Sequence, residues 1–363
     1  MCRALERLLH MIKSDKEIDL AKTNANAELQ CLYDSIIALA EAAVPFYDKI
    51  EGYFFQDIDY RLFQGATPIW MSDAGRSVEC SWNRVFYDKV RQIYNDPISN
   101  RVLHLYDVRS IVSAFQDRAT AVNKYLREIF AVIPAYCLYS DDDYSNAMRD
   151  MSDRSDQVHA SINNVFVSLS SAFDLFTKIV YECSRYDPKN FTNYKKLKSR
   201  ADSVLYAKKN FGFDELKEPG LLYDEPKCIR TICSFRDEFI HSGSWDYRCA
   251  VYYPNINGEL VEPFIPMPDI EPSGVLVSSG SRNKFYASGA KINIEMPVLV
   301  GEVIEVLSKT LERLKEVLDS KTIPLPQEER EKNAMAYMKV LTENAKKLPG
   351  VFVKKESNLE LST

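Results

Sequence analysis

Apolar side chains recur at steps of three and four residues through the middle of the chain, and this pattern constrains its fold more than any other feature of the sequence. The pattern runs over residues 155–184 and comprises Val158, Ile162, Val165, Leu169, Ala172, Phe176, Ile179 and Cys183. Because an α-helix has about 3.6 residues per turn, these side chains share one face. The spacing therefore predicts a long amphipathic helix over residues 155–184.

Shorter stretches of the same periodicity lie on both sides of this segment. One run extends from Leu29 to Ala43 and ends at Pro45, because proline breaks a helix interior. Further helices are predicted over residues 79–95, 102–133, 226–241, 297–319 and 328–348. Ser242-Gly243 is a natural stop for the helix over residues 226–241. The chain is therefore predicted to be mainly α.

Residues 248–295 differ in composition from the helical segments. They contain short β-type runs, such as residues 250–253 and 274–277. Asn257-Gly258, which lies between two of these runs, is a pair that favours a tight hairpin turn. Several prolines interrupt the region, and proline in a sheet is confined to edges and bulges. We expect a small β-rich insertion at 248–295.

The chain has 363 residues, which corresponds to about two domains at a typical ~150 residues each. An acidic stretch that is poor in apolar residues runs from Asp141 to Asp156, and we place a domain boundary there. Its spacing does not fit a calcium loop, which needs a glycine and a terminal glutamate, so we interpret it as a solvated connector. We expect a helical N-terminal domain over residues 1–150, a helical domain over 151–320, and a linker, C-terminal helix and tail over 321–363.

Net charge and cysteine spacing exclude several classes of protein. The formal charge is −6, which excludes a uniformly basic nucleic-acid coat protein, so any contact with nucleic acid must use a local patch. The eight cysteines form no C-x-x-C pair and lack zinc-site spacing, which predicts reduced thiols with no metal or other cofactor. Charges interrupt the apolar runs near the N-terminus, and no apolar run approaches ~20 residues. We therefore expect a cytoplasmic protein with no membrane partner.

One charged residue interrupts the apolar pattern of the helix predicted over residues 226–241. With Ile229 at zero on a wheel of about 100° per residue, Ile232 falls at about 300° and Ile240 at about 20°. Arg236 falls at about 340° on the same wheel, in the middle of this apolar stripe. A cation there must be paired, open a polar pocket or lie at an interface. Its guanidinium would also suit a phosphate, because it offers two parallel N–H donors.

His241 lies near the end of the same helix, where the negative end of the helix dipole favours its protonated form. Asp237 lies four residues earlier on the same face, in position to orient the imidazole ring. An anion binder, a proton carrier and a carboxylate together suit cleavage of RNA without a metal. In that reaction the 2′-hydroxyl attacks the phosphorus and a proton goes to the 5′-oxygen. Because Arg236 and His241 point about 140° apart, one site needs either a bent helix end or two copies of the chain.

The segment from Arg236 to His241, Arg-Asp-Glu-Phe-Ile-His, resembles the Arg-x(4–6)-His signature of HEPN domains (higher eukaryotes and prokaryotes nucleotide-binding). A polar residue commonly follows the arginine in that family, and Asp237 fits. The resemblance covers roughly residues 155–320 and implies an antiparallel helical bundle that is usually a homodimer. Many members are metal-independent ribonucleases of toxin–antitoxin, abortive-infection and other antiviral defence systems. The family often adds an acidic residue on the upstream helix, for which Asp174 is the candidate, and the insertion at 248–295 departs from its minimal bundle.

The segment over residues 185–210 is strongly basic, with eight lysines and arginines against two acidic residues. Aromatic residues such as Phe191 and Tyr194 are interleaved with these charges. Cations for phosphates and aromatic faces for bases are typical of a surface that binds single-stranded RNA. The candidate RNA-binding residues are Lys195, Lys196, Lys198, Arg200, Lys208 and Lys209. The alternative is a solvated basic loop whose aromatic residues belong to the core.

These residues suggest three hypotheses for the function of the chain. In the first, the chain is a metal-independent endoribonuclease of HEPN type that acts as a homodimer. Arg236 then binds the phosphate, His241 is the general acid and base, Asp237 orients the imidazole, and residues 1–150 sense a trigger or a regulatory protein partner. In the second, the chain is a non-catalytic HEPN-like interaction module, in which Arg236 is a buried structural cation and His241 caps the helix. A nucleotide-binding module that partners a nucleotidyltransferase is a third hypothesis.

Overall fold

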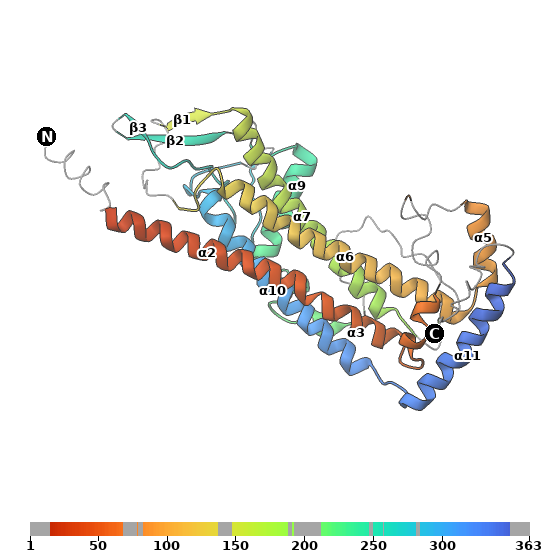
Figure 1. Cartoon of the computed structure of the whole chain (residues 1–363). Helices are drawn as coiled ribbons and strands as arrows, with labels where there is room; N and C mark the ends of the chain where they lie inside the picture. Colours follow the sequence, from red (N-terminus) through yellow and green to blue (C-terminus); the bar gives the residue numbers. More distant parts are fainter. Residues whose placement is uncertain are drawn as a thin grey trace, which may run out of the picture. The chain divides into compact units, whose positions relative to one another are not determined.

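The computed structural model describes residues 15–67, 78, 83–136, 147–187, 191, 212–246, 250–256, 258–280 and 284–348. Most of this part of the chain is helical, which confirms the prediction of a mainly α protein (Figure 1). The α-helices are α2 (Asp15–Ala42), α3 (Val44–Phe54), α5 (Arg84–Ile93), α6 (Pro97–Phe130), α7 (Asp153–Ser184), α9 (Lys227–Ser242), α10 (Ile292–Lys321) and α11 (Gln327–Lys346). The 3₁₀ turns are η1 (Tyr60–Leu62), η2 (Gln64–Ala66), η4 (Asp214–Lys217) and η5 (Leu222–Asp224), and the strands are β1 (Ala147–Asp150), β2 (Val251–Ile256) and β3 (Glu259–Leu260).

Helix α10 begins before the proline that was predicted to open it. Its first residue is Ile292, so Pro297 lies inside the helix, where it removes one backbone donor. Asn293 holds this first turn in place with a buried side chain. That side chain donates to the Pro134 carbonyl (2.7 Å) and accepts from the Ile265 N–H (3.3 Å). Tertiary hydrogen bonds thus extend the helix beyond the point that local sequence signals indicate.

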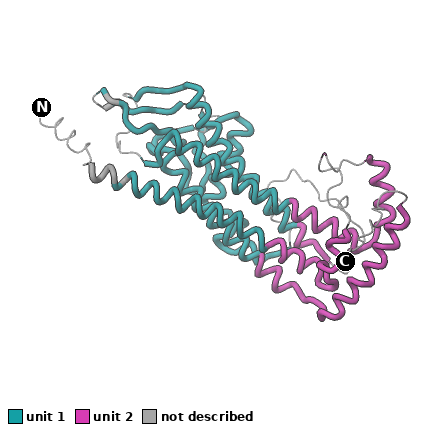
Figure 2. The backbone as a smooth tube through the Cα atoms, in the orientation of Figure 1, with its two compact units in different colours: residues 1–45, 111–181, 202–314 teal, residues 46–110, 182–201, 315–363 magenta. Residues whose placement is uncertain are grey.

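The chain forms two compact units, each assembled from segments that are far apart in the sequence (Figure 2). The first unit comprises residues 1–45, 111–181 and 202–314, and the second comprises residues 46–110, 182–201 and 315–363. The division falls within α3, α6, α7 and α10. The domain boundary predicted at residue 150 lies inside the first unit.

Helices of the first unit meet through both apolar and polar contacts. The rings of Phe115 on α6 and Phe176 on α7 are buried with their centroids 5.7 Å apart. The Gln116 amide on α6 donates to the carbonyl of Ala40 on α2 (2.8 Å). The apolar face of α7 that the sequence predicted, from Val158 to Cys183, is buried throughout.

A small antiparallel sheet of β1, β2 and β3 also belongs to the first unit. β1 pairs with β2 so that Ala147 lies opposite Pro254 and Asp150 opposite Val251. β2 and β3 form the predicted hairpin, in which Gly258 has a φ of 93° and its N–H donates to the Asn255 side chain (2.9 Å). β1 was not predicted, because a four-residue strand carries too short a pattern to detect. Its pairing joins the acidic connector to the insertion, which is why residue 150 is no boundary of the compact units.

The second unit surrounds a buried cation. Arg101 on α6 is almost fully buried, and its guanidinium donates to the carbonyl of Phe54 (2.7 Å) and to the carboxylate of Asp57 (2.6 Å). The Tyr337 hydroxyl of α11 lies 2.7 Å from the Ser99 hydroxyl of α6, which attaches α11 to this unit. Both terminal nitrogens of the guanidinium and both hydroxyls have partners, whereas the Arg101 Nε atom has none among the described residues.

The segment Lys22–Phe54 includes an 18-residue window with a mean hydropathy of 1.3, of which 33% is buried, and by length and composition alone it could cross a membrane. The buried helices of a soluble protein have the same composition. Within this segment, Leu29, Leu32 and Ile36 are buried, as the predicted helical face requires.

His104 lies in the aromatic core of the second unit, with only 4% of its surface exposed. Its ring centroid is 5.0 Å from that of Phe54 and 6.2 Å from that of Tyr186. Within the described part of the chain, its Nε2 atom has no hydrogen-bond partner. Burial lowers the pKa of His104 to about 4, because the core cannot solvate an imidazolium.

The burial of a neutral His104 predicts that the protein loses stability as the pH falls. The unfolded imidazole has a pKa of about 6.5, so between pH 6.5 and pH 4 the unfolded chain binds a proton that the folded chain does not. His104 should therefore lower the free energy of unfolding by about 2 kcal/mol between about pH 7.5 and pH 5. Urea denaturation at both pH values should show this loss in the wild type and a smaller one in His104→Phe. Equal losses of unfolding free energy in the two proteins would show that His104 is not the cause.

Candidate functional site

One face of α9 is buried against α7, and this contact fixes how the helix is rotated. Phe235 and Phe239 are both buried. Their ring centroids lie 4.5 Å and 5.6 Å from that of Phe166 on α7. The same packing buries Ile229 and Ile232. Because these four residues occupy one side of α9, the remaining faces are available to polar side chains.

Arg236 lies at the edge of this buried face and not in its middle. Its side chain is 31% exposed, and Ile240, which the wheel had placed beside it in the stripe, is 52% exposed. The centre of the stripe was misplaced because Phe235 and Phe239 were left out of the wheel. On the same wheel Phe235 lies about 100° from Arg236. The guanidinium is therefore accessible, and its Nη1 donates to the Asp237 carboxylate at 2.7 Å.

His241 is exposed in the last turn of α9. The helix continues without a break to Ser242 and stops at Gly243, as predicted. Gly243 has a φ of 85°, which glycine adopts without strain, and its N–H donates to the Phe239 carbonyl (3.2 Å). Because the helix end is not bent, Arg236 and His241 leave the helix in different directions.

An open pocket of about 540 Å³ lies along the face of α9 that carries His241. The helix contributes Arg230, Cys233, Ser234, Asp237, Glu238, His241 and Ser242 to its lining. Glu225, Val275, Leu276 and Ser278 complete the lining. The Leu276 N–H donates to the Ser234 hydroxyl (3.1 Å), which ties the insertion to the helix. The β-rich insertion therefore supplies a wall of this pocket and leaves His241 accessible.

Asp237 connects the two residues that the helix separates. Its carboxylate lines the pocket beside His241 and also accepts the hydrogen bond from Arg236. Arg236 itself does not line the pocket, so its link to the pocket is this hydrogen bond to Asp237. No hydrogen bond joins Asp237 to His241 in the described part of the chain. The carboxylate that was predicted to orient the imidazole binds the guanidinium instead.

Asp174, the acidic candidate on α7, belongs to the same group of charges. The pKa of the Cys233 thiol is raised to about 12, mainly by burial and further by the carboxylates of Asp237 and Asp174. The Arg236 guanidinium acts in the opposite direction and lowers it. Three charged residues of the predicted site therefore lie close enough to Cys233 to affect its ionisation. At neutral pH this thiol is protonated, so it is not a nucleophile.

A buried ion pair and an exposed cation near the pocket were missed by the sequence analysis. Glu238 has a side chain only 9% exposed and pairs with Lys284 (3.2 Å), which also donates to the Ser244 carbonyl (3.0 Å). This pair joins the loop before α10 to the end of α9. Arg230 is exposed, lines the pocket and shares a helix face with Asp237 and His241. Spacings of seven and eleven residues would have revealed that shared face.

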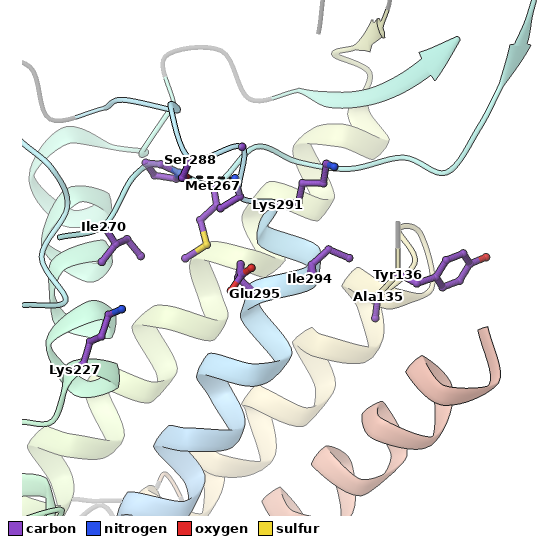
Figure 3. A pocket seen from close by; sticks show the side chains of 12 residues that line it. Ala135, Tyr136, Lys227, Met267, Ile270, Ser288, Lys291, Ile294 and Glu295 are labelled. Carbon is purple, nitrogen blue, oxygen red and sulfur yellow. Dashed lines mark hydrogen bonds between the residues drawn. The ribbon is translucent and has the colours of Figure 1, made fainter. Parts of the chain in front are cut away.

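A second pocket, of about 680 Å³, lies where α9 and α10 begin. Lys227 of α9 and Glu295 of α10 both line it, and Met267 and Ile270 contribute apolar surface (Figure 3). A backbone hydrogen bond from Met267 to Ala290 (2.8 Å) closes the loops around it. Of the predicted site residues that the structure describes, Arg236, Asp237 and His241 do not line this pocket.

The six predicted RNA-binding residues, Lys195, Lys196, Lys198, Arg200, Lys208 and Lys209, lie outside the described residues. Among the described residues, no group of three or more histidine, cysteine, aspartate or glutamate side chains is arranged to hold a metal ion. No family model, no curated protein and no solved structure matches the chain.

The rotation of α9 can be tested by its effect on stability. Phe235→Ala should lower the free energy of unfolding by about 3–5 kcal/mol, because it removes a ring packed on Phe166. Ile240→Ala, on the exposed side, should change it by no more than about 0.5 kcal/mol. Chemical denaturation measures both. A large loss of stability in Ile240→Ala would show that the buried face is centred near Arg236 and Ile240, as the helical wheel first predicted.

Proposed function

We propose that the chain is a metal-independent endoribonuclease of HEPN type whose site lies at the C-terminal end of α9. The observation that carries this proposal is the double role of Asp237. Its carboxylate lines the pocket that contains His241 and holds the Arg236 guanidinium at 2.7 Å. A proton carrier and a phosphate binder are thereby available to one bound substrate.

The chemistry assigned to the site is transfer within the RNA strand. A 2′-hydroxyl loses its proton to His241, and its oxygen forms a bond to the neighbouring phosphorus. The bond from phosphorus to the 5′-oxygen breaks, and His241 returns a proton to that oxygen. Arg236 stabilises the negative charge that grows on the non-bridging oxygens. The products are a 2′,3′-cyclic phosphate and a free 5′-hydroxyl.

The ion pair of Arg236 with Asp237 is compatible with binding of a phosphate. The Asp237 side chain is 58% exposed, and ion pairs of this exposure contribute about 0–1 kcal/mol. A guanidinium has five N–H donors, and the bond to Asp237 uses one. In this proposal Asp237 positions Arg236, in place of the orienting role toward His241 that the sequence suggested.

The exposure of Arg236 argues against a purely structural role. A buried structural cation would be sealed against Asp174 or Glu238, whereas Glu238 pairs with Lys284 and Arg236 keeps 31% of its side chain exposed. The packing of α7 and α9 in the first unit is consistent with the proposed HEPN-like bundle. The homodimer and the control of the site by residues 1–150 are part of the same proposal.

Cleavage in the presence of EDTA tests the enzyme directly. The wild type should cut single-stranded RNA and leave cyclic phosphate ends, which mass spectrometry identifies. His241→Ala should lower the rate about 10²–10⁴-fold, and Arg236→Gln about 10²–10³-fold. Lys309→Gln, which removes an exposed lysine far from α9 in sequence, serves as the control. Equal cleavage by all four proteins would assign the activity to a contaminant, and toxicity on expression provides a readout that includes any cellular activator.

Mixing two inactive variants tests whether the site lies in one chain. Because Arg236 pairs with Asp237 of its own helix, and Asp237 lines the pocket beside His241, a mixture of His241→Ala and Arg236→Gln should stay as inactive as either variant alone. Recovery of about a quarter or more of wild-type activity would show that each site combines Arg236 of one copy with His241 of another. Light scattering on the same samples reports whether a dimer forms.

A further inference from the structure

Arg230 is the cation of the pocket that the predicted motif does not include. It is exposed on α9, and within the described residues its guanidinium has neither an ion pair nor a hydrogen bond. It shares the helix face of Asp237 and His241, which lie seven and eleven residues later. An arginine in a pocket with no partner of its own is available to an anion.

The distance along the helix excludes a direct role for Arg230 in the reaction. Eleven residues at about 1.5 Å each separate it from His241 by about 16 Å. A phosphate held by Arg230 is therefore not the phosphate that His241 serves. A stacked single strand advances about 3.4 Å per nucleotide, so this separation corresponds to roughly five nucleotides, and to fewer if the strand is extended.

The pocket suits a single strand better than a duplex. Its volume, about 540 Å³, is in the range of sites that enclose a small ligand or unstacked bases. Val275 is 44% exposed on the wall formed by the insertion and offers an apolar surface to a base. Two of the carboxylates in the lining, Asp237 and Glu238, are neutralised by Arg236 and Lys284. Their ion pairs reduce the repulsion that a phosphate would meet.

Glu225 also lines this pocket and has an unusual backbone. Its φ is 56°, and no other non-glycine residue in the described part of the chain has a positive φ. Such conformations are costly for side chains with a Cβ and are concentrated at functional sites. Glu225 immediately precedes Pro226, which opens α9, so this residue sets the direction in which the chain enters the helix.

We propose that single-stranded RNA lies along α9 from His241 toward Arg230, and that Arg230 holds a phosphate several nucleotides from the cleaved bond. This inference rests on the proposed function and specifies its substrate, which must extend beyond a dinucleotide on one side. Arg230 is then a residue for binding and length preference, and contributes nothing to the chemical step.

Comparison of substrates of two lengths tests the role of Arg230. Arg230→Gln should raise KM about ten-fold for an RNA of about twelve nucleotides and leave kcat unchanged. It should leave both constants unchanged for a dinucleotide, which cannot reach from His241 to Arg230. Lys227→Gln, one turn earlier on the same helix but facing the second pocket, should behave as the wild type with both substrates. An unchanged KM for the long RNA, or an equal change in Lys227→Gln, would overturn the inference while cleavage itself stands.

A binding experiment separates failure of this inference from failure of the enzyme hypothesis. Fluorescence anisotropy with a 2′-O-methyl RNA of about twelve nucleotides, which cannot be cleaved, measures affinity without activity. Arg230→Gln should weaken binding about ten-fold, and Lys227→Gln should not. Weaker binding by Arg230→Gln, without cleavage by any variant, would support RNA binding along the pocket and contradict the nuclease function. Equal affinity of the wild type and Arg230→Gln would contradict the proposed role of Arg230 in binding RNA.

Discussion

The packing of Phe235 and Phe239 against Phe166 is the contact on which the site depends. It joins α9 to α7 in the first unit and fixes which side of α9 is buried. Once these rings are buried, the geometry of the helix determines where every polar side chain on α9 must point. Asp237 and His241 then share the face that borders the pocket, and Arg236 lies at the boundary between the buried and exposed faces.

A second aromatic contact controls how the chain leaves α9. Trp245 is buried two residues after Gly243, with its ring 5.5 Å from Phe239 and 4.8 Å from His159 of α7. The His159 Nε2 atom lies 3.2 Å from the Ala250 carbonyl, at the start of the insertion. These contacts anchor Trp245 and Ala250 against α7. The insertion can therefore return along α9 and place Val275 and Leu276 against the pocket.

Much of α9 could be predicted from the sequence, because its signals are local. Both ends of the helix were predicted to within one residue. The signals were the periodic apolar residues, Pro226 before the first turn and Ser242-Gly243 at the end. The shared face of Asp237 and His241 also follows from their spacing. The position of Arg236 at the edge of the buried face could not be predicted in the same way. The helical wheel was centred on isoleucines and omitted Phe235 and Phe239, which bury more surface.

Features that depend on contacts between distant segments could not be predicted. The wall of the pocket comes from residues 275–278, and the Glu238–Lys284 pair joins positions 46 residues apart in the sequence. β1 forms only because β2 is there to pair with it. No periodicity or motif in the sequence encodes such partners.

The central claim is that His241 and the Arg236 guanidinium serve one phosphate in the pocket along α9. The most direct test is NMR of the histidine rings during titration with uridine 3′-monophosphate, since the chain has only four histidines. The claim predicts that the His241 resonances shift to saturation, that those of the buried His104 and His159 do not, and that Arg236→Gln requires higher ligand concentrations. His241 resonances that stay fixed at saturating ligand, or that titrate identically in Arg236→Gln, would contradict it.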